Sequence, residues 1–348
     1  MVIHTEPPEA ADSYRADYAA GVERFIKEQN TLAKQARTAF MPPEDFPAKI
    51  EHYREMFLQM LGTSRLPDNG SPQLKQEFSD ADDVCSIYRV TVTVLGCIPF
   101  YGLLMVPHSV SGAAKSPLII AQHGGGGTPE LAADFHGKNN YGHLIQRLLA
   151  RGAVVFAPQL LLWNQGETFD TCPGHKVPYD RTVTDVNLKR MGLSITGLEI
   201  YCISQSVTAL SALDAVDETA VGMAGLSYGG YYTLYTMAAD TRIKSGLACG
   251  CFNDRDCYPW QDMTYFQSGT TFQDAEVAAL CAPRRLYVSI GEKDPVFTFQ
   301  TALPEARRVK PYYQAFGAEQ NFVFETWNGE HTVNPAPDGF DFLFSAFK

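Results

Sequence analysis

Short apolar runs and helix-favouring stretches alternate along most of this 348-residue chain, and no other feature limits its possible folds as strongly. The runs predict buried strands at residues 117–122, 153–157, 220–226, 245–249, 285–290 and 321–326. An antiparallel hairpin at the sheet edge is expected ahead of them, at residues 86–95 and 98–106. Helices are expected at residues 141–150, 195–213, 231–239, 301–316 and 339–347. Such a succession is typical of a mostly parallel sheet with helices on both faces, so the sequence predicts an α/β fold.

The residues ahead of the hairpin have a different character. Residues 13–61 are charged and helix-favouring, with a stop at Met41-Pro42-Pro43. Residues 62–80 are rich in Pro, Gly, Ser and Asp, which predicts a loop. We therefore expect an N-terminal helical segment and linker at residues 1–80, and one large α/β domain at residues 81–348.

Two long stretches within that domain, residues 159–191 and 252–280, do not follow the alternation. Long insertions at strand ends usually form lids or pocket walls. Several aromatic side chains in them could stack on sugars, line an acyl pocket or fill the core of a lid. These are Trp163, Phe169, Tyr179, Tyr258, Trp260 and Phe266.

The composition excludes several classes of partner. A net charge of -11 argues against nucleic acid and anionic membranes, because phosphate contacts require clustered Lys and Arg. Residues 1–20 are polar and acidic, unlike a secretory signal, and no uncharged apolar run reaches membrane-spanning length. We therefore expect a soluble, cytoplasmic protein that binds neither nucleic acid nor membrane.

The eight cysteines are scattered rather than arranged as a disulfide framework. Four lie among apolar residues, as buried free thiols do: Cys97, Cys202, Cys249 and Cys281. The closest group, Cys249, Cys251 and Cys257, lacks the C-x-x-C spacing of a zinc site. We expect no metal and no cofactor.

The pattern G-x-S-x-G occurs at residues 225–229, immediately after a predicted strand and before a predicted helix. Glycines on both sides of Ser227 leave room for a tight strand-to-helix turn that exposes the serine at the carboxyl edge of the sheet. The N-terminus of the following helix favours negative charge. This setting predicts that Ser227 is a nucleophile.

Four consecutive glycines, Gly124 to Gly127, follow His123 at the end of another predicted strand. A tetrahedral intermediate needs backbone N–H donors for its oxyanion, and glycines let a loop approach that closely. In this kind of site one donor is the residue after the nucleophile and the other lies on the glycine loop. We therefore predict that the N–H groups of Tyr228 and Gly125 are the donors. A flexible loop or a phosphate cradle is the alternative, but the Gly-Lys-Ser/Thr of a Walker loop is missing. His123 is expected to shape the loop rather than act as the base.

An acid and a base should follow the nucleophile along the chain. Asp294 lies just after the strand predicted at residues 285–290, with Glu292 as a local competitor. Asp254 and Asp256, after the preceding strand, are further candidates in a less usual position. His331 is the one histidine downstream of Ser227. We therefore predict a Ser227, Asp294 and His331 triad.

With these motifs the sequence resembles the α/β-hydrolase superfamily, from about residue 48 to the C-terminus. It is most similar to the acetyl xylan esterase-like and dienelactone hydrolase-related branch. The similar features are the helix that ends at Gly62, the hairpin ahead of the His-Gly loop, the Gly-Leu-Ser-Tyr-Gly-Gly turn and Gly-Glu-Lys-Asp-Pro at residues 291–295. The resemblance implies an α/β-hydrolase fold and a serine esterase that cleaves small or carbohydrate-linked acyl esters, such as acetyl esters.

The sequence departs from some relatives. Dienelactone hydrolases use cysteine where this chain has Ser227, so their lactone chemistry is not implied. Tyr228-Gly229-Gly230-Tyr231 also resembles prolyl oligopeptidases, but those carry a propeller domain, and no repeated strand pattern occurs here. A catalytically silent hydrolase fold used for binding is a third hypothesis. The N-terminal helices could pack on a neighbouring subunit and make a homo-oligomer.

Overall fold

The computed structural model describes residues 3–67, 70–110, 115–137, 139–162 and 180–348. The strands of this part of the chain are β1 (Gln73–Ala81), β2 (Cys85–Val94), β3 (Ile98–Pro107), β4 (Ser116–Gln122), β5 (Val154–Pro158), β6 (Val216–Leu226), β7 (Ile243–Cys249), β8 (Arg285–Gly291) and β9 (Phe322–Trp327). They form a single sheet in the order β1-β2-β3-β5-β4-β6-β7-β8-β9. Strands β4 to β9 pair in parallel, whereas β1, β2 and β3 pair antiparallel and β3 joins β5 antiparallel. The predicted mostly parallel sheet is confirmed.

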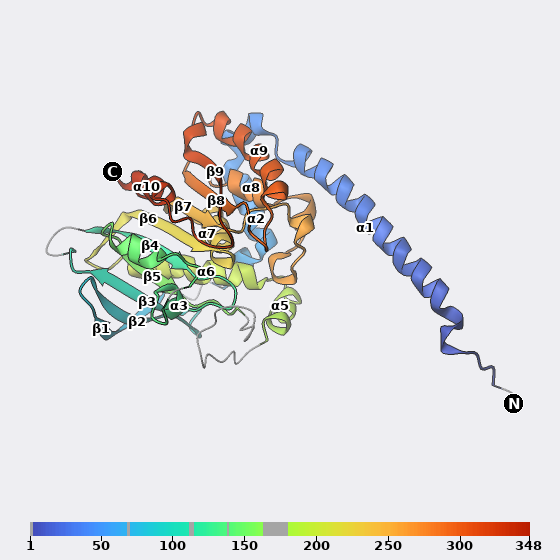
Figure 1. Ribbon diagram of the computed structural model, residues 1–348, viewed down its shortest axis with the longest axis horizontal. Helices are drawn as coiled ribbons and strands as arrows, with labels where there is room; N and C mark the ends of the chain where they lie inside the picture. Colours follow the sequence, from blue (N-terminus) through green and yellow to red (C-terminus); the bar gives the residue numbers. More distant parts are fainter. Residues whose placement is uncertain (1–2, 68–69, 111–114, 138, 163–179) are drawn as a thin grey trace.

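The helices of the described residues are α1 (Asp12–Phe40), α2 (Phe46–Leu61), α3 (Pro129–Ala132), α4 (Leu144–Leu149), α5 (Arg181–Lys189), α6 (Ile195–Leu210), α7 (Tyr228–Ala239), α8 (Asp274–Ala279), α9 (Phe299–Ala315) and α10 (Asp338–Phe344). Figure 1 shows helices on both sides of the sheet. Leu118 and Ile120 of β4 pack in one core with α2, α6, α7, α8 and α9. Ile119 and Ala121 point the other way, into a second core with α4 and α10. Side chains alternate between the faces of a strand, so β4 is covered on both sides.

One strand lies where we predicted a loop. Residues 73–81 form β1, which pairs with β2 from Gln73 opposite Thr93 to Ala81 opposite Ser86. Nearly all of its side chains are exposed, and its sequence contains no apolar run. An edge strand with two solvated faces lacks the hydrophobic pattern from which strands are predicted. The sheet therefore begins at Gln73, ahead of the predicted domain start at residue 81, and β1 rather than the hairpin forms its edge.

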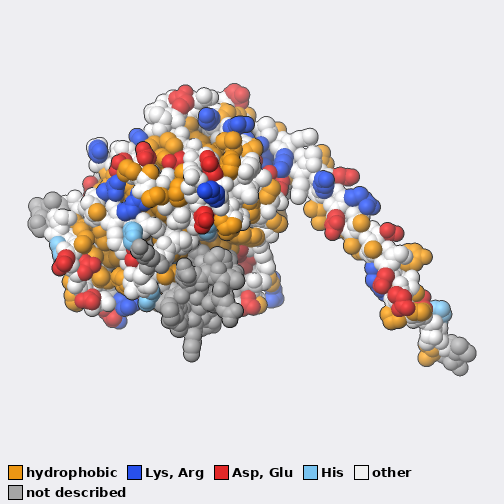
Figure 2. Space-filling model, viewed as in Figure 1, with side chains coloured by type: hydrophobic (Ala, Val, Ile, Leu, Met, Phe, Trp, Pro, Cys, Tyr) orange, Lys and Arg blue, Asp and Glu red, His pale blue; other side chains and the backbone are white. Residues whose placement is uncertain are grey.

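The predicted N-terminal helices are present as α1 and α2, separated at Met41-Pro42-Pro43. Helix α1 extends away from the rest of the molecule (Figure 1), and hydrophobic side chains lie along it (Figure 2). Those with large exposed fractions are Tyr14, Tyr18, Val22, Phe25, Ile26 and Leu32. The homo-oligomer stays a prediction.

The C-terminal end of α1 is held against the body by a buried ionic cluster. Arg37 is fully buried, with Nη1 3.1 Å from Glu276 Oε2 and 3.5 Å from Glu305 Oε2. Burial raises the pKa of Glu305 to about 7, and the Arg37 charge opposes this rise. A buried arginine needs such partners, because an unpaired charge inside a protein is costly.

The seven described cysteines are all free. Cys202, Cys249 and Cys281 are buried, as predicted. The prediction was wrong for Cys97, which lies in the turn between β2 and β3 and is exposed. Its apolar neighbours in sequence face the core from the two strands, whereas the turn itself extends into solvent. Across the described part of the chain, no helix combines the length and apolar character needed to cross a membrane.

Candidate active site

Ser227 lies at the junction of β6 and α7, in the strand-turn-helix setting that the sequence predicts. Its backbone has φ 60° and ψ −121°, a sharp turn that leaves the residue partly exposed at the carboxyl edge of the sheet. Ser227 N donates to Cys249 O of the neighbouring strand at 2.9 Å, and Ser227 O accepts from Tyr231 N at 2.9 Å. The serine is thus fixed on both sides by regular structure.

Two glycines allow the elements around Ser227 to approach closely. A Cβ at Gly229 would lie 2.0 Å from Gln122 O, because the first turn of α7 packs directly on the end of β4. A Cβ at Gly124 would lie 2.9 Å from Leu226 O and 3.1 Å from Ser227 Cβ. A side chain at Gly229 would push α7 away from the end of β4, and one at Gly124 would push the glycine loop away from Ser227.

The glycine loop is a tight turn. Gly124 O accepts from Gly127 N at 3.1 Å, and Gly126 between them has φ 68°, which favours glycine. Gly124 N donates to the buried hydroxyl of Tyr141 at 2.8 Å. Gly125 is partly exposed, and its N–H donates to no residue in the described ranges. The loop therefore keeps one of its N–H groups available beside Ser227.

His123 holds the base of this loop, as the sequence predicts. Its Nε2 accepts from Leu160 N at 3.0 Å, so the proton lies on Nδ1, which donates to Gly124 O at 2.9 Å. The side chain is buried. His123 therefore joins the end of β4 to the chain that follows β5, and both of its ring nitrogens are used in doing so.

The structure brings Asp294 and His331 together. His331 Nδ1 lies 2.8 Å from Asp294 Oδ2. The other carboxylate oxygen, Oδ1, accepts from Val296 N at 2.8 Å and from Phe297 N at 2.9 Å. The Asp294 side chain is fully buried, whereas His331 is 12% exposed. A carboxylate only accepts, so Nδ1 donates, and in a neutral imidazole this leaves the lone pair on Nε2.

The loop that carries His331 is held by Asn140. Asn140 Nδ2 donates to His331 O at 3.2 Å, and Asn140 O accepts from Thr332 Oγ1 at 2.6 Å and from Val333 N at 3.2 Å. The hydroxyl of the next residue, Tyr141, accepts a hydrogen bond from Gly124 N of the glycine loop. Two neighbouring residues thus fix the histidine loop and the glycine loop relative to each other.

The other acidic candidates lie elsewhere. Glu292 is exposed and accepts from Thr326 Oγ1 at 3.1 Å. Asp254 and Asp256 lie 2.7 and 3.5 Å from Lys34 Nζ. Asp294 is the carboxylate that contacts His331.

Ser227 and His331 lie at the same edge of the sheet. Cys249 O accepts from Ser227 N, and the next residue is Gly250. A Cβ at Gly250 would lie 3.2 Å from His331 Nδ1. Within the described residues, neither Ser227 Oγ nor His331 Nε2 forms a hydrogen bond. The structure therefore shows the Asp294–His331 contact of the predicted triad, whereas a hydrogen bond between His331 and Ser227 stays a prediction.

Tyr228, the residue after Ser227, contacts a buried ionic cluster that the sequence did not predict. The Tyr228 hydroxyl donates to Asp262 Oδ1 at 3.1 Å, and Asp262 Oδ2 lies 2.6 Å from Arg181 Nε. The Nη1 and Nη2 atoms of Arg181 each lie 3.1 Å from an oxygen of buried Glu199. Arg181 and Asp262 come from different insertions, so no local pattern links them. The cluster joins both insertions to the residue that follows Ser227.

Replacing Arg181 with methionine is expected to lower the free energy of unfolding by about 3–5 kcal/mol, because Glu199 and Asp262 would lose the charge that offsets their burial. Urea unfolding measures the change. Arg190→Met is the matched control, since Arg190 is exposed just after α5, and it should change stability by less than about 0.5 kcal/mol. Equal stability of the two variants would contradict this account of the cluster.

Aromatic residues of the second insertion lie beside the site. Trp260 stacks on Tyr228 with ring centroids 5.6 Å apart and an interplanar angle of 16°. Phe297, whose centroid is 5.9 Å from that of His331, contacts Trp260 at 5.4 Å and Tyr258 at 4.9 Å. These contacts are consistent with a pocket wall, which stays a prediction. Trp163, Phe169 and Tyr179 lie outside the described residues.

Among the residues that the structure describes, no group of three or more His, Cys, Asp or Glu side chains could hold a metal ion. The arrangement that remains is a serine on a tight turn, an Asp-His pair and a loop with an available N–H. Attack on a carbonyl carbon needs a hydroxyl as nucleophile, an imidazole as base and N–H donors for the oxyanion, and this set offers groups of all three kinds.

No family model and no curated protein matches the chain. Solved structures do. A candidate acetyl xylan esterase from Bacteroides fragilis is 16% identical and has a TM-score of 0.64 over 85% of this chain and 81% of its own. A glucuronoyl esterase from Solibacter usitatus, also 16% identical, has a TM-score of 0.59 over 85% and 92%. Acetyl xylan esterase 1 from Thermoanaerobacterium, at 14% identity, has a TM-score of 0.55 over 90% and 98%. The chain has the α/β-hydrolase fold.

Proposed function

We propose that this protein is a serine carboxylic ester hydrolase that forms an acyl-enzyme on Ser227. The observation that carries the proposal is the Asp294–His331 pair, with its 2.8 Å hydrogen bond, at the sheet edge where the nucleophile turn presents Ser227. This is the order and placement that a serine hydrolase of this fold requires.

In the proposed mechanism, His331 Nε2 takes the proton of Ser227 Oγ as that oxygen attacks the ester carbonyl. The carbonyl oxygen becomes an oxyanion, which accepts from the N–H groups of Gly125 and Tyr228. The tetrahedral intermediate collapses, the C–O bond to the alcohol breaks, and the alcohol leaves with the proton from His331. Asp294 stabilises the imidazolium in between.

The second half of the reaction repeats these steps with water. His331 takes a proton from a water molecule, whose oxygen attacks the acyl carbon. The bond to Ser227 Oγ breaks, the serine recovers its proton from His331, and the carboxylic acid leaves. The proposed cycle consumes one ester and one water and needs neither metal nor organic cofactor.

The proposed substrates are small or carbohydrate-linked acyl esters, such as acetyl esters. Two observations support this class: solved structures with the same fold include proteins named acetyl xylan esterase and glucuronoyl esterase, and Trp260 and Phe297 place aromatic rings beside Tyr228 and His331. Aromatic rings suit both sugar faces and small acyl groups.

An assay with two chromogenic substrates tests the reaction class. We expect turnover of p-nitrophenyl acetate, and no comparable turnover of a proline p-nitroanilide. A prolyl oligopeptidase-like enzyme would give the opposite preference, and a catalytically silent fold would hydrolyse neither. Either of those results would contradict the proposal.

A further inference from the structure

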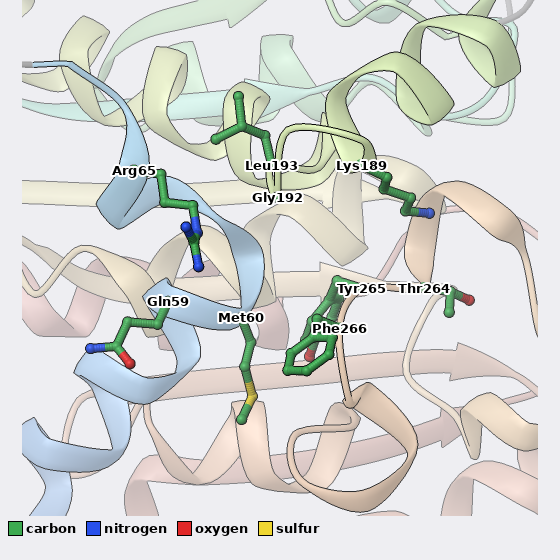
Figure 3. A pocket seen from close by; sticks show the side chains of 9 residues that line it. All are labelled: Gln59, Met60, Arg65, Lys189, Gly192, Leu193, Thr264, Tyr265 and Phe266. Carbon is green, nitrogen blue, oxygen red and sulfur yellow. The ribbon is translucent and has the colours of Figure 1, made fainter.

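A pocket of about 470 Å³ lies between three segments that are far apart in the sequence. It is lined by Gln59, Met60, Arg65, Lys189, Gly192, Leu193, Thr264, Tyr265 and Phe266 (Figure 3). None of these belongs to the proposed triad or oxyanion loop. The volume falls in the range of small-molecule sites, roughly 300–1,000 Å³.

The walls of this pocket are firmly joined. The C-terminal end of α2 packs on the loop before α6 so closely that a Cβ at Gly62 would lie 2.5 Å from Gly192 O. Ser194 Oγ donates to Leu61 O at 2.7 Å across the same contact. The pocket is therefore formed before any ligand binds, which lowers the entropy cost of binding.

Arg65 supplies the charge of the pocket. In Figure 3 its side chain extends into the space above Met60. A Cβ at Gly192 would lie 3.3–3.5 Å from the Arg65 side chain. Because glycine has no Cβ, the arginine can lie against the backbone of residue 192. Arg65 is exposed, and no ion pair joins it to a carboxylate of the described residues, so its charge is open to a ligand. Lys189 differs, because its Nζ lies 2.6 Å from Asp185 Oδ2.

The opposite side of the pocket is apolar. Phe266 is 72% exposed and lines the pocket together with Met60, and in Figure 3 both side chains lie below that of Arg65. An exposed ring can stack on a flat ligand face, and a thioether adapts to its outline. The pocket thus places one guanidinium opposite a surface that suits a ring.

We propose that this pocket is a second ligand site, which binds a carboxylate carried on a ring. The planar guanidinium of Arg65 pairs with the carboxylate through two parallel N–H···O bonds, and Phe266 and Met60 contact the ring. A single arginine fits a planar carboxylate better than a phosphate, whose oxygens would need further donors. Two sources share this chemistry: a uronic acid sugar and an aromatic acid.

Calorimetric titration of the full-length protein with digalacturonate and with ferulate tests the proposal. At least one acid is expected to bind, and the one that binds identifies the source. Its neutral counterpart, α-1,4-linked galactobiose or ferulamide, should bind at least roughly tenfold more weakly, because it lacks the charge-assisted hydrogen bonds. None of these probes is an ester, so the outcome does not depend on whether Ser227 hydrolyses esters.

Two arginine variants locate the site. Arg65→Met should raise the Kd of the bound acid at least roughly tenfold, whereas Arg307→Met, at an exposed position on α9, should leave it unchanged. Thermal unfolding checks that both variants fold. Phe266→Ala should raise the Kd roughly threefold or more through the lost ring contact. The proposal is overturned if neither acid binds, if the neutral counterpart binds equally well, or if the two arginine variants bind alike.

Discussion

Replacing Ser227 with alanine is expected to lower kcat for ester hydrolysis by a factor on the order of 10⁴ to 10⁶. The change removes the oxygen that would form the acyl-enzyme, while Asp294, His331 and the glycine loop stay in place. The residual rate would come from a directly attacking water and from the oxyanion donors. Hydrolysis of p-nitrophenyl acetate under saturating substrate measures the effect.

A second serine variant separates this loss from general damage. Ser204 lies on α6, away from the nucleophile turn, so Ser204→Ala should keep the wild-type rate. Labelling by a fluorophosphonate should follow the same pattern, with no adduct in the Ser227 variant. Full ester turnover in Ser227→Ala would show that the reaction does not pass through this serine.

Replacing Asp294 with asparagine should lower kcat by about 10⁴-fold. The amide keeps the size of the side chain but removes its negative charge, and its NH₂ group can donate to His331 Nδ1, which then loses its proton. The proton would then lie on His331 Nε2, so that this nitrogen could not accept a proton from Ser227. The kcat of the variant with p-nitrophenyl acetate measures this loss.

Glu292→Gln is the matched control, because Glu292 lies two residues away, is exposed and bonds Thr326 instead of His331. This variant should hydrolyse esters at the wild-type rate. If Glu292→Gln lost activity and Asp294→Asn kept it, the acid of the proposed triad would be wrongly assigned.

The parts of the site that the sequence predicted are those set by local structure. Ser227 sits where a buried strand meets a helix, and the turn between them leaves few residue types possible on either side. Asp294 and His331 follow the last two strands, and the carboxyl ends of parallel strands meet at one edge of a sheet. The order of the residues along the chain and the positions of the strand ends were therefore enough to predict that Asp294 and His331 lie together.

The parts that escaped prediction depend on tertiary contacts. Arg181 and Asp262 belong to insertions without regular patterns, and only folding shows that they share Tyr228. Tyr141 supports the glycine loop from a helix-favouring stretch, where a tyrosine suggests only core packing. Strand β1 is held by backbone pairing rather than by buried side chains, so its polar sequence gave no periodicity.

The backbone angles of Ser227 have a consequence for stability. A non-glycine residue at φ 60° and ψ −121° costs about 1–3 kcal/mol, of which glycine's greater freedom in the unfolded chain would return about 0.5–1 kcal/mol. Ser227→Gly should therefore unfold at higher urea concentration than Ser227→Ala, although both lack the hydroxyl. If the two variants unfold together, the turn carries no such cost. If the turn does carry this cost, a screen that rewarded folding alone would favour glycine at position 227, and only selection for activity would keep a serine there.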